Sequence, residues 1–253
     1  MFYLMNEMKG REMTRRLKEV LIFTPTPNEF KGVSRHIGQA SFSNFKATVV
    51  ECGPGKINAT FKLAAEVIPR LGQGHKPAFL VGSGTSGSLS LSLTEGDMIA
   101  SSSVTISDWR MEDDSSRQFS AYGLFDYKPL APAAAEEMAL TCDDFVVKRL
   151  MSKLESRDFK IGRMMTSDTF VAGVDNKISS GKNFNCLACD MESGAFAFTA
   201  RNLLGGIPWF NLRVVADTLD ENLSDYFKKE INMVEILGQK TAEALTVLDK
   251  LLD

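Results

Sequence analysis

Residues Leu187–Asp217 of the chain read LACDMESGAFAFTARNLLGGIPWFNLRVVAD. Asp190 and Glu192 open an apolar stretch of helical character, and a Gly-Gly-Ile-Pro break separates it from a run that ends on Asp217. The run Trp209 to Val215 is typical of a buried strand. Ligands of open α/β sheets bind beyond the carboxyl ends of the strands. Because a carboxylate there costs desolvation energy, these acids predict a functional site.

The remainder of the chain alternates between strand and helix patterns. Apolar runs predict strands at 20–23, 47–52, 78–81, 97–106 and 159–166, and spacings of three and four predict helices at 57–71, 136–154, 193–204 and 231–252. Residues 108–131 are polar and aromatic and predict a loop region. Strands that alternate with helices favour a parallel sheet covered on both faces. We expect an α/β fold, a single-domain three-layer α/β/α arrangement with a central mixed, mostly parallel sheet.

Composition restricts the classes of function. The chain has 253 residues, 44% of them hydrophobic and 24% charged, with a formal net charge of −3. No basic run suits nucleic acid or an anionic membrane surface, and no apolar run reaches the roughly 20 residues of a membrane span. Residues 1–18 are expected to form a polar N-terminal extension, with Met13 as an alternative start of translation, and residues 19–253 to form the domain. A cytoplasmic location is expected.

The four cysteines include the pair Cys186 and Cys189 at metal-ligand spacing. A four-cysteine zinc site needs a second such pair, and a redox pair normally opens a helix after a strand. Reduced core thiols are therefore the favoured interpretation. The two histidines lie far apart in polar surroundings, which gives little support to a metal site or a Ser-His-Asp triad.

Unusual residues follow five of the predicted strands. They are Glu29, the Gly53–Gly55 turn, the Gly82–Gly87 segment, Asp168–Phe170 and Asp217. Because parallel strands end at one edge of a sheet, these residues predict a cleft with three carboxylates, a hydroxyl-rich glycine turn and an aromatic ring. The glycine segment has G-x-G-x-x-G spacing, but a turn into another strand follows it instead of the helix that a dinucleotide site requires.

Several ordered motifs carry a resemblance to a known family. They are GPGKINA at 53–59, GTSGSL at 84–89, SDTFVAG at 167–173, DME at 190–192 and RVVAD at 213–217. The last two, in that order and about 20 residues apart, are the most specific. Over residues 19–250 the chain resembles the nucleoside phosphorylase and nucleosidase superfamily, most closely the methylthioadenosine/S-adenosylhomocysteine nucleosidases. The resemblance implies a nucleoside phosphorylase-like fold.

The resemblance also implies the chemistry of purine N-glycosidic bond cleavage. Asp217 matches the aspartate that donates a proton toward purine N7, and such a proton is worth about 10²- to 10⁴-fold in rate. Glu29 aligns with the acid that activates the attacking water. Asp217 and Glu29 are therefore the expected catalytic residues. A cap for Glu192 and an ion pair of Asp217 with Arg213 are the structural alternatives.

Further positions match residues that bind the substrate. Glu192 matches the glutamate that binds the ribose hydroxyls, with Met191 packing on the sugar. Phe170 would stack on the base, and the backbone of Val171 would bind the purine edge. Two more positions complete the set: Thr85 would place a hydroxyl near the nucleophile, and Phe227, in a mobile-looking segment from Asp220 to Lys229, would close over the 5′ substituent. No metal and no organic cofactor is implied.

The nucleophile is water or phosphate. A phosphorylase holds its dianion with basic residues, whereas the segments 24–30 and 82–88 contain none. Glu29 would repel an anion and suits water, so hydrolysis is favoured. Lys31, Arg35 and Lys56 lie near enough in sequence to keep phosphorolysis open.

Departures from the family pattern leave the substrate open. Ala216 stands where the family has a serine that supports the catalytic aspartate, and Thr26 and Pro27 replace a methionine and an acid. Trp109 to Lys128, where the family commonly shapes the 5′ pocket, matches poorly. Methylthioadenosine, adenosylhomocysteine, futalosine, AMP and an unmodified nucleoside stay open. So do a phosphorylase and a non-catalytic nucleoside-binding or storage relative. The expected partners are a small-molecule nucleoside and a second copy of the chain, as a homodimer or a higher homo-oligomer, without nucleic acid or membrane.

Overall fold

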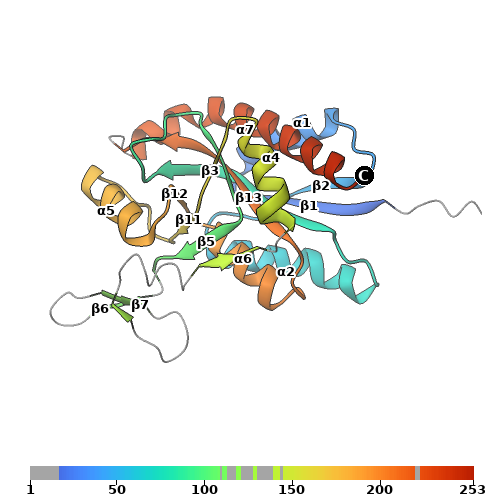
Figure 1. Ribbon diagram of the computed structural model, residues 1–253, viewed down its shortest axis with the longest axis horizontal. Helices are drawn as coiled ribbons and strands as arrows, with labels where there is room; N and C mark the ends of the chain where they lie inside the picture. Colours follow the sequence, from blue (N-terminus) through green and yellow to red (C-terminus); the bar gives the residue numbers. More distant parts are fainter. Residues whose placement is uncertain are drawn as a thin grey trace, which may run out of the picture.

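The structure is a computed structural model that describes residues 17–108, 110–112, 118–120, 128–129, 139–142, 145–219 and 223–253. These residues form a ten-stranded sheet with helices on both faces (Figure 1). Its strands are β1 (Lys18–Thr24), β2 (Phe45–Glu51), β3 (Phe79–Ser88), β4 (Met98–Ser101), β5 (Ser103–Ile106), β9 (Leu140–Thr141), β10 (Phe159–Ile161), β11 (Met164–Thr166), β12 (Ala188–Asp190) and β13 (Trp209–Asp217). The helices are α1 (Pro27–Gln39), α2 (Lys56–Gly72), α4 (Met151–Glu155), α5 (Val174–Phe184), α6 (Ser193–Asn202) and α7 (Leu223–Leu251), with a π-helical turn at Phe145–Leu150.

Strand β3 is the centre of the sheet. One edge of β3 pairs in parallel with β13 along most of its length. Its other edge pairs with β1 over Phe79–Gly82 and with β12 over Gly87–Ser88. Residues 83–86 of β3 therefore lie between two partner strands, and no described strand pairs with them on that edge. This gap in the sheet is where the candidate site opens.

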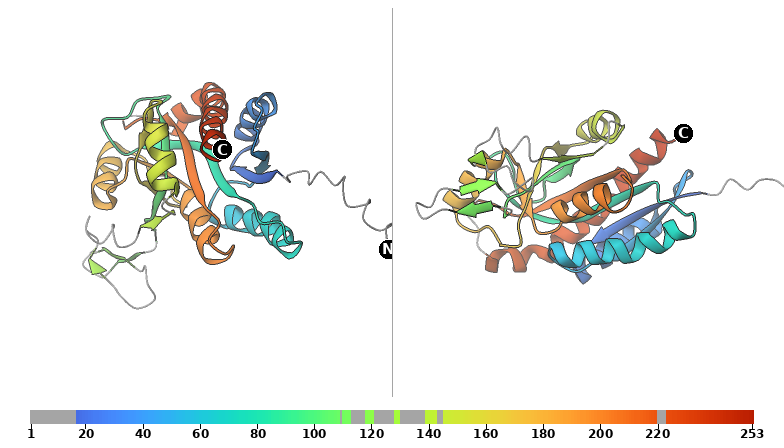
Figure 2. Two further views of the ribbon diagram at one scale, coloured as in Figure 1. Left: turned by 45° about the vertical axis from the view of Figure 1, so that its right-hand side comes forward. Right: turned by 90° about the horizontal axis from the view of Figure 1, so that it is seen from below.

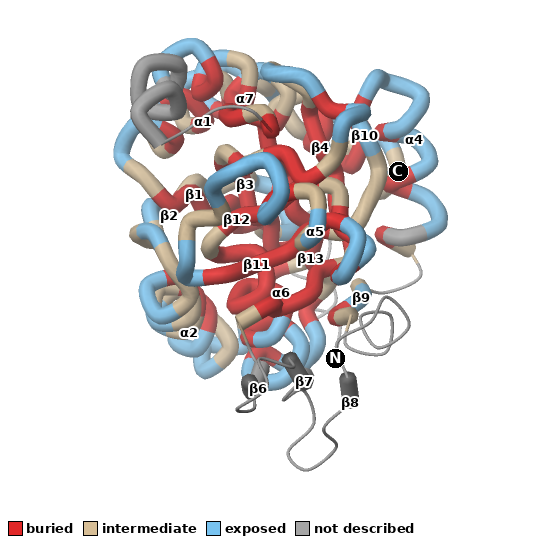
Figure 3. Tube along the Cα trace, turned by 90° about the vertical axis from the view of Figure 1, so that its left-hand side faces the viewer, coloured by how far each residue is buried: buried red, intermediate tan, exposed pale blue. Residues whose placement is uncertain are grey.

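Two hydrophobic clusters give the molecule three layers (Figure 2). Apolar side chains of α1, α4 and α7 pack on one face of the sheet. Those of α2 and α6 pack on the other face. Figure 3 shows the strands as buried chain between α7 and α2, whose outer turns are exposed. Burial of both faces explains why the strands read as continuous apolar runs.

The mixed, mostly parallel α/β/α fold predicted from the sequence is confirmed. Several element predictions are wrong in detail. The strands expected at 97–106 and 159–166 are each two shorter strands, and the helix expected at 136–154 contains β9, the π-helical turn and the short α4. In the region expected to be a loop, β6 (Arg110–Glu112), β7 (Gln118–Ser120) and β8 (Lys128–Pro129) form a small antiparallel sheet.

The largest correction concerns Gly82–Gly87, which the sequence predicts as a turn. The segment is extended and belongs to β3. Its glycines are explained by close neighbours instead of turn geometry. A Cβ at Gly82 would lie 2.1 Å from the Asn211 side chain, and one at Gly87 would lie 2.5 Å from a carboxylate oxygen of Asp217. The strand needs glycine at these positions because the side chains of Asn211 and Asp217, on β13, lie where a Cβ would be.

No helix among the described residues is both long and apolar enough to cross a membrane. Residues 1–16 of the expected N-terminal extension, which include Met13, lie outside the described residues.

Candidate active site

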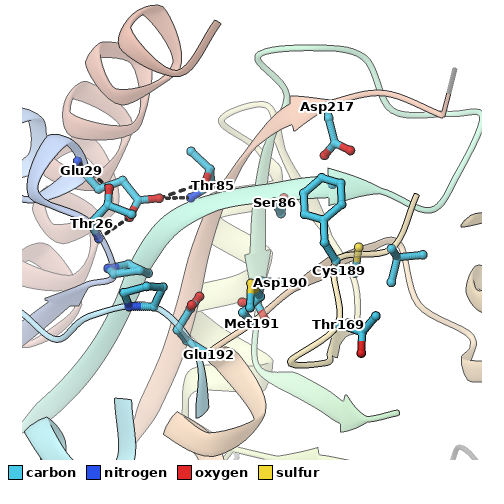
Figure 4. A pocket seen from close by; sticks show the side chains of 15 residues that line it. Thr26, Glu29, Thr85, Ser86, Thr169, Cys189, Asp190, Met191, Glu192 and Asp217 are labelled. Carbon is cyan, nitrogen blue, oxygen red and sulfur yellow. Dashed lines mark hydrogen bonds between the residues drawn. The ribbon is translucent and has the colours of Figure 1, made fainter. Parts of the chain in front are cut away.

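A cavity of about 410 Å³ lies where the strands end (Figure 4). Its walls come from the ends of β1, β2, β11, β12 and β13 and from the carboxyl-terminal half of β3, at the gap in the sheet. The lining residues are Pro25, Thr26, Glu29, Pro54, Thr85, Ser86, Gly87, Thr169, Phe170, Val171, Cys189, Asp190, Met191, Glu192 and Asp217. Nearly all of the predicted site residues therefore meet at one place. Figure 4 shows Glu29 and Asp217 on opposite sides of the cavity.

Glu29 is held from three directions. One carboxylate oxygen accepts hydrogen bonds from the backbone N–H (2.7 Å) and the hydroxyl (2.9 Å) of Thr85. The other accepts from the backbone N–H of Thr26 at 2.9 Å, as part of a capping box that starts α1. The Thr85 N–H is available because β3 has no described strand partner on that edge. Burial raises the pKa of Glu29, and the bond from the Thr85 backbone opposes this rise.

Glu192 lies between β12 and α6, as the N-cap residue of α6. One of its oxygens accepts from the backbone N–H of Gly55 at 2.8 Å, and the other lies 3.8 Å from a guanidinium nitrogen of Arg213. Gly55 has φ +86°, a conformation that favours glycine and turns its N–H toward Glu192. Burial, with Asp190 adding to it, raises the pKa of Glu192 to about 8.

Asp190 anchors Arg213 within the same cluster. The Nε of Arg213 donates to Asp190 at 2.7 Å, and both side chains are buried. Asp190 also accepts from the hydroxyl of Thr166 at 2.7 Å and from the backbone N–H and hydroxyl of Ser193. These bonds use the acceptor sites of its carboxylate, so Asp190 has a structural role. The ion pair of Asp217 with Arg213, considered above as an alternative, is not the one that forms.

Asp217 is paired with a lysine instead. The ammonium of Lys177, on α5, donates to Asp217 Oδ2 at 2.6 Å and to the carbonyl of Thr218 at 2.5 Å. Both side chains are buried. Lys177 was not predicted from the sequence, because no helix was expected at residues 174–184. The available pattern was the spacing of Lys177, Gly181 and Phe184, which places all three on one helical face.

Part of the cavity wall is apolar. Phe170, Val171 and Met191 line it, together with Cys189. Burial raises the pKa of the Cys189 thiol, so Cys189 is un-ionised at neutral pH. Cys186 and Cys189 are both free thiols, as predicted. Among the described residues, no group of three or more His, Cys, Asp or Glu side chains could hold a metal ion.

The remaining candidate residues lie outside this wall. Lys56 forms an ion pair with Asp108 and lies 3.3 Å from Asp168. Arg35 pairs with Glu235 at 2.8 Å on the surface of α1 and α7. Phe227 falls in the part of α7 whose side chains lie outside the described residues, as do residues 220–222 altogether. Helix α7 begins at Leu223, so much of the segment expected to be mobile is helical.

Comparison with known proteins identifies the family. A family model for the phosphorylase superfamily matches residues 10–251. The chain belongs to the phosphorylase superfamily. It is 23% identical over 208 residues to the 5′-methylthioadenosine/S-adenosylhomocysteine nucleosidase of Staphylococcus haemolyticus, covering 82% of this chain and 81% of that protein.

Solved structures share the superfamily fold. The S-adenosylhomocysteine nucleosidase of Streptococcus pyogenes, solved with 5-methylthiotubericidin, superposes with a TM-score of 0.69 at 22% identity, covering 94% of this chain and 99% of that one. The futalosine hydrolase of Helicobacter pylori superposes with a TM-score of 0.69 at 17% identity, covering 92% and 98%. At these identities the likeness establishes the three-layer fold of this superfamily member.

Proposed function

We propose that this superfamily member is a purine nucleosidase that hydrolyses the N-glycosidic bond of a 5′-substituted adenosine, such as methylthioadenosine or S-adenosylhomocysteine. One observation carries the proposal. Besides the structural Asp190, three buried carboxyl groups, Glu29, Glu192 and Asp217, line a single cavity, and each is held by a different partner. The nucleosidases among its relatives support the substrate class.

Asp217 serves as the acid in this proposal. An anionic purine is a poor leaving group, and a proton placed on N7 makes it a better one. Phe170 would stack on the purine beside Asp217, and the Val171 backbone would bind its edge. Both residues line the cavity with Asp217.

Glu29 and Glu192 act on the sugar side. Positive charge develops on the ribose as the bond breaks, and carboxylates stabilise it electrostatically. Glu192 would bind the ribose hydroxyls, with Met191 packed on the sugar. Glu29 would take a proton from the attacking water, with the Thr85 hydroxyl beside it at 2.9 Å. The raised pKa of Glu29 makes it a stronger base than an exposed carboxylate.

Water is favoured over phosphate as the nucleophile. None of the fifteen residues that line the cavity in the described part of the chain is basic. Of the basic residues that left phosphorolysis open, Lys56 and Arg35 are engaged by acids, and Lys31 is exposed on α1. A phosphate dianion at this place would face Glu29 without a cation among the lining residues to hold it.

The test is release of adenine from methylthioadenosine with and without phosphate, followed by chromatography. Adenine released without phosphate supports the proposal. Release that requires phosphate would establish a phosphorylase, and no release from any purine nucleoside would favour a nucleoside-binding protein. A panel with adenosylhomocysteine, futalosine, AMP and adenosine identifies the 5′ substituent.

We extend the proposal to the setting of the protein. The enzyme would act in the cytoplasm, where methylthioadenosine hydrolysis would serve methionine salvage. The chain would form a homodimer. Helix α2 exposes Ile57 (82%), Phe61 (73%) and Ile68 (48%), which helical spacing puts on one side. An exposed apolar stripe of this kind is typical of a protein interface.

A further inference from the structure

Lys177 is a buried cation that the proposed chemistry leaves without a task. Its side chain is fully buried on α5, and its ammonium bonds Asp217 Oδ2 and the Thr218 carbonyl. It does not line the cavity, so it does not touch the substrate. Moving a lysine ammonium out of water is unfavourable, and an ion pair offsets only part of that free energy. A buried lysine at this place indicates an effect on the charge of the Asp217 carboxyl group.

The position of Lys177 is fixed by the packing of α5. Gly181 lies one turn further along the same face, and a Cβ there would be 2.4 Å from the backbone oxygen of Leu89. Phe184, on this face as well, is buried in a cluster with Leu89 and Cys189. This contact sets α5 against the end of β3, beside Gly87 and Asp217. The ammonium therefore reaches Asp217 from a rigid support.

In the part of the chain that the structure describes, the other charged and titratable groups near Asp217 do not replace Lys177. From β12, Cys189 is an un-ionised thiol and Asp190 is engaged by Arg213. Arg213, on β13 itself, is directed to Asp190 and Glu192. The residues of β3 that face Asp217 at the cavity, Ser86 and Gly87, carry no charge. Among the described residues, Lys177 thus brings a positive charge to within 2.6 Å of the Asp217 carboxyl group.

We propose that Lys177 is a positioning residue that stabilises the negative charge developing on Asp217 as this carboxyl group gives its proton to the departing base. The inference rests on the proposed function. In the step, the proton moves from an Asp217 oxygen to a purine nitrogen, and the electrons of the C–N bond go to the base. Lys177 takes no part in this transfer. An ammonium aimed at the place where charge develops lowers the barrier without reorganising during the reaction.

The test compares rate–pH profiles of the wild type with those of Lys177→Met, Lys177→Gln and Lys177→Arg. Without the ammonium, Asp217 is a weaker acid that keeps its proton to higher pH. For Lys177→Met and Lys177→Gln we expect kcat on the acidic plateau to fall by roughly 10- to 100-fold, with KM nearly unchanged and the alkaline limb of the profile moved to higher pH. Lys177→Arg, which keeps a cation, should retain the wild-type limb. Lys182→Met, on the exposed side of α5, is the matched control.

The outcomes separate the inference from the function on which it rests. A wild type that releases no base from any nucleoside overturns the proposed function. An active wild type whose Lys177→Met and Lys177→Gln variants lose rate equally at every pH shows a merely structural lysine and overturns the inference alone. Wild-type rates in Lys177→Gln would do the same, because the charge would then be dispensable. If Lys177→Met does not fold, the comparison of Lys177→Gln with Lys177→Arg decides.

Discussion

Asp217 carries the proton of the proposed reaction, and its amide counterpart tests this role. Asp217→Asn keeps an oxygen that can accept from Lys177 but has no acidic proton to give. We expect the rate of adenine release to fall by about 10²- to 10⁴-fold, while circular dichroism shows a folded protein. The melting temperature should drop, because an amide oxygen is a weaker acceptor for the buried Lys177 ammonium than the carboxyl group of Asp217.

Asp175→Asn is the control for this variant. Asp175 is exposed in the first turn of α5, close to Lys177 in the chain and outside the cavity lining. Its activity should equal that of the wild type. Wild-type turnover in Asp217→Asn would remove Asp217 from the mechanism.

Glu192 makes the stability of the empty enzyme depend on pH. Its folded-state pKa of about 8 lies above the ordinary value of 4.5. Because burial favours the protonated form, the folded state binds this proton more tightly than the unfolded chain does. The stability that the Glu192 proton contributes is therefore fully present below about pH 4.5 and is lost as the pH rises through about 8. The raised pKa of Glu29 acts in the same direction.

Glu192→Gln should remove the larger part of this dependence. We expect urea unfolding from pH 5 to pH 8 to give a flatter stability curve for the variant, which should exceed the wild type at the alkaline end. Glu155→Gln, on the exposed surface of α4, should keep the wild-type slope. Equal slopes for Glu192→Gln and the wild type would contradict the burial argument.

Strand β3 needs its glycines because other side chains lie against it. At Gly87 a Cβ would be 2.5 Å from Asp217 Oδ1, and at Gly84 it would be 3.1 Å from Glu29 Oε1. Gly87→Ala should therefore displace Asp217 and lower kcat by about 10-fold or more, with a smaller loss for Gly84→Ala. Steady-state kinetics of the two variants measures the difference.

Gly38→Ala is the comparison for these strand variants. Gly38 lies in α1 and is exposed, and a Cβ added there would have no neighbouring atom within 4 Å. Alanine should raise the free energy of unfolding by about 0.5–1 kcal/mol, because glycine is a poor helix residue, without changing activity. If Gly87→Ala were as active as Gly38→Ala, the close approach of Asp217 to β3 would not affect kcat.

The elements of this site differed in how well the sequence could predict them. Local patterns predicted α6 and β13, because each places apolar residues on a face that the sheet or a helix covers. They also predicted α2, although the apolar spacing there includes Ile57, Phe61 and Ile68, which are exposed. They failed at β3, where Gly82–Gly87 reads as a turn: only tertiary contacts with Asn211 and Asp217 explain why an extended strand has no side chains there. They failed again at α5, whose polar sequence VDNKISSGKNF has a weak apolar stripe.

The same difference applies to the site. Strand ends located Glu29, Glu192 and Asp217 in the sequence, since parallel strands end at one edge. The partners of these acids could not be found in that way. Lys177 reaches Asp217 across 40 residues of chain, and Thr85 reaches Glu29 across 56. Such pairs depend on how the layers stack, which no local pattern records.

In the whole molecule, the site lies where the carboxyl ends of the strands meet, and an exposed apolar face lies on helix α2. Helix α2 supports the cavity at its first turn, where Gly55 binds Glu192. Along its length it exposes Ile57, Phe61 and Ile68 to solvent, and α6, which packs beside it, exposes 38% of Phe198. A dimer formed through this face would bury these side chains and hold α2, and with it Gly55, against the site.

Phe61→Glu tests this arrangement. A carboxylate buried in the middle of an apolar interface is strongly unfavourable, so we expect light scattering after size exclusion to show a dimer for the wild type and a monomer for the variant. Leu91→Glu, at an equally exposed leucine on the turn after β3, should stay dimeric. If α2 steadies the site through the dimer, the Phe61→Glu monomer should also have a higher KM, because Glu192 would lose part of its support. A monomeric wild type would exclude the proposed face, and a monomeric Phe61→Glu variant with unchanged KM would separate assembly from substrate binding.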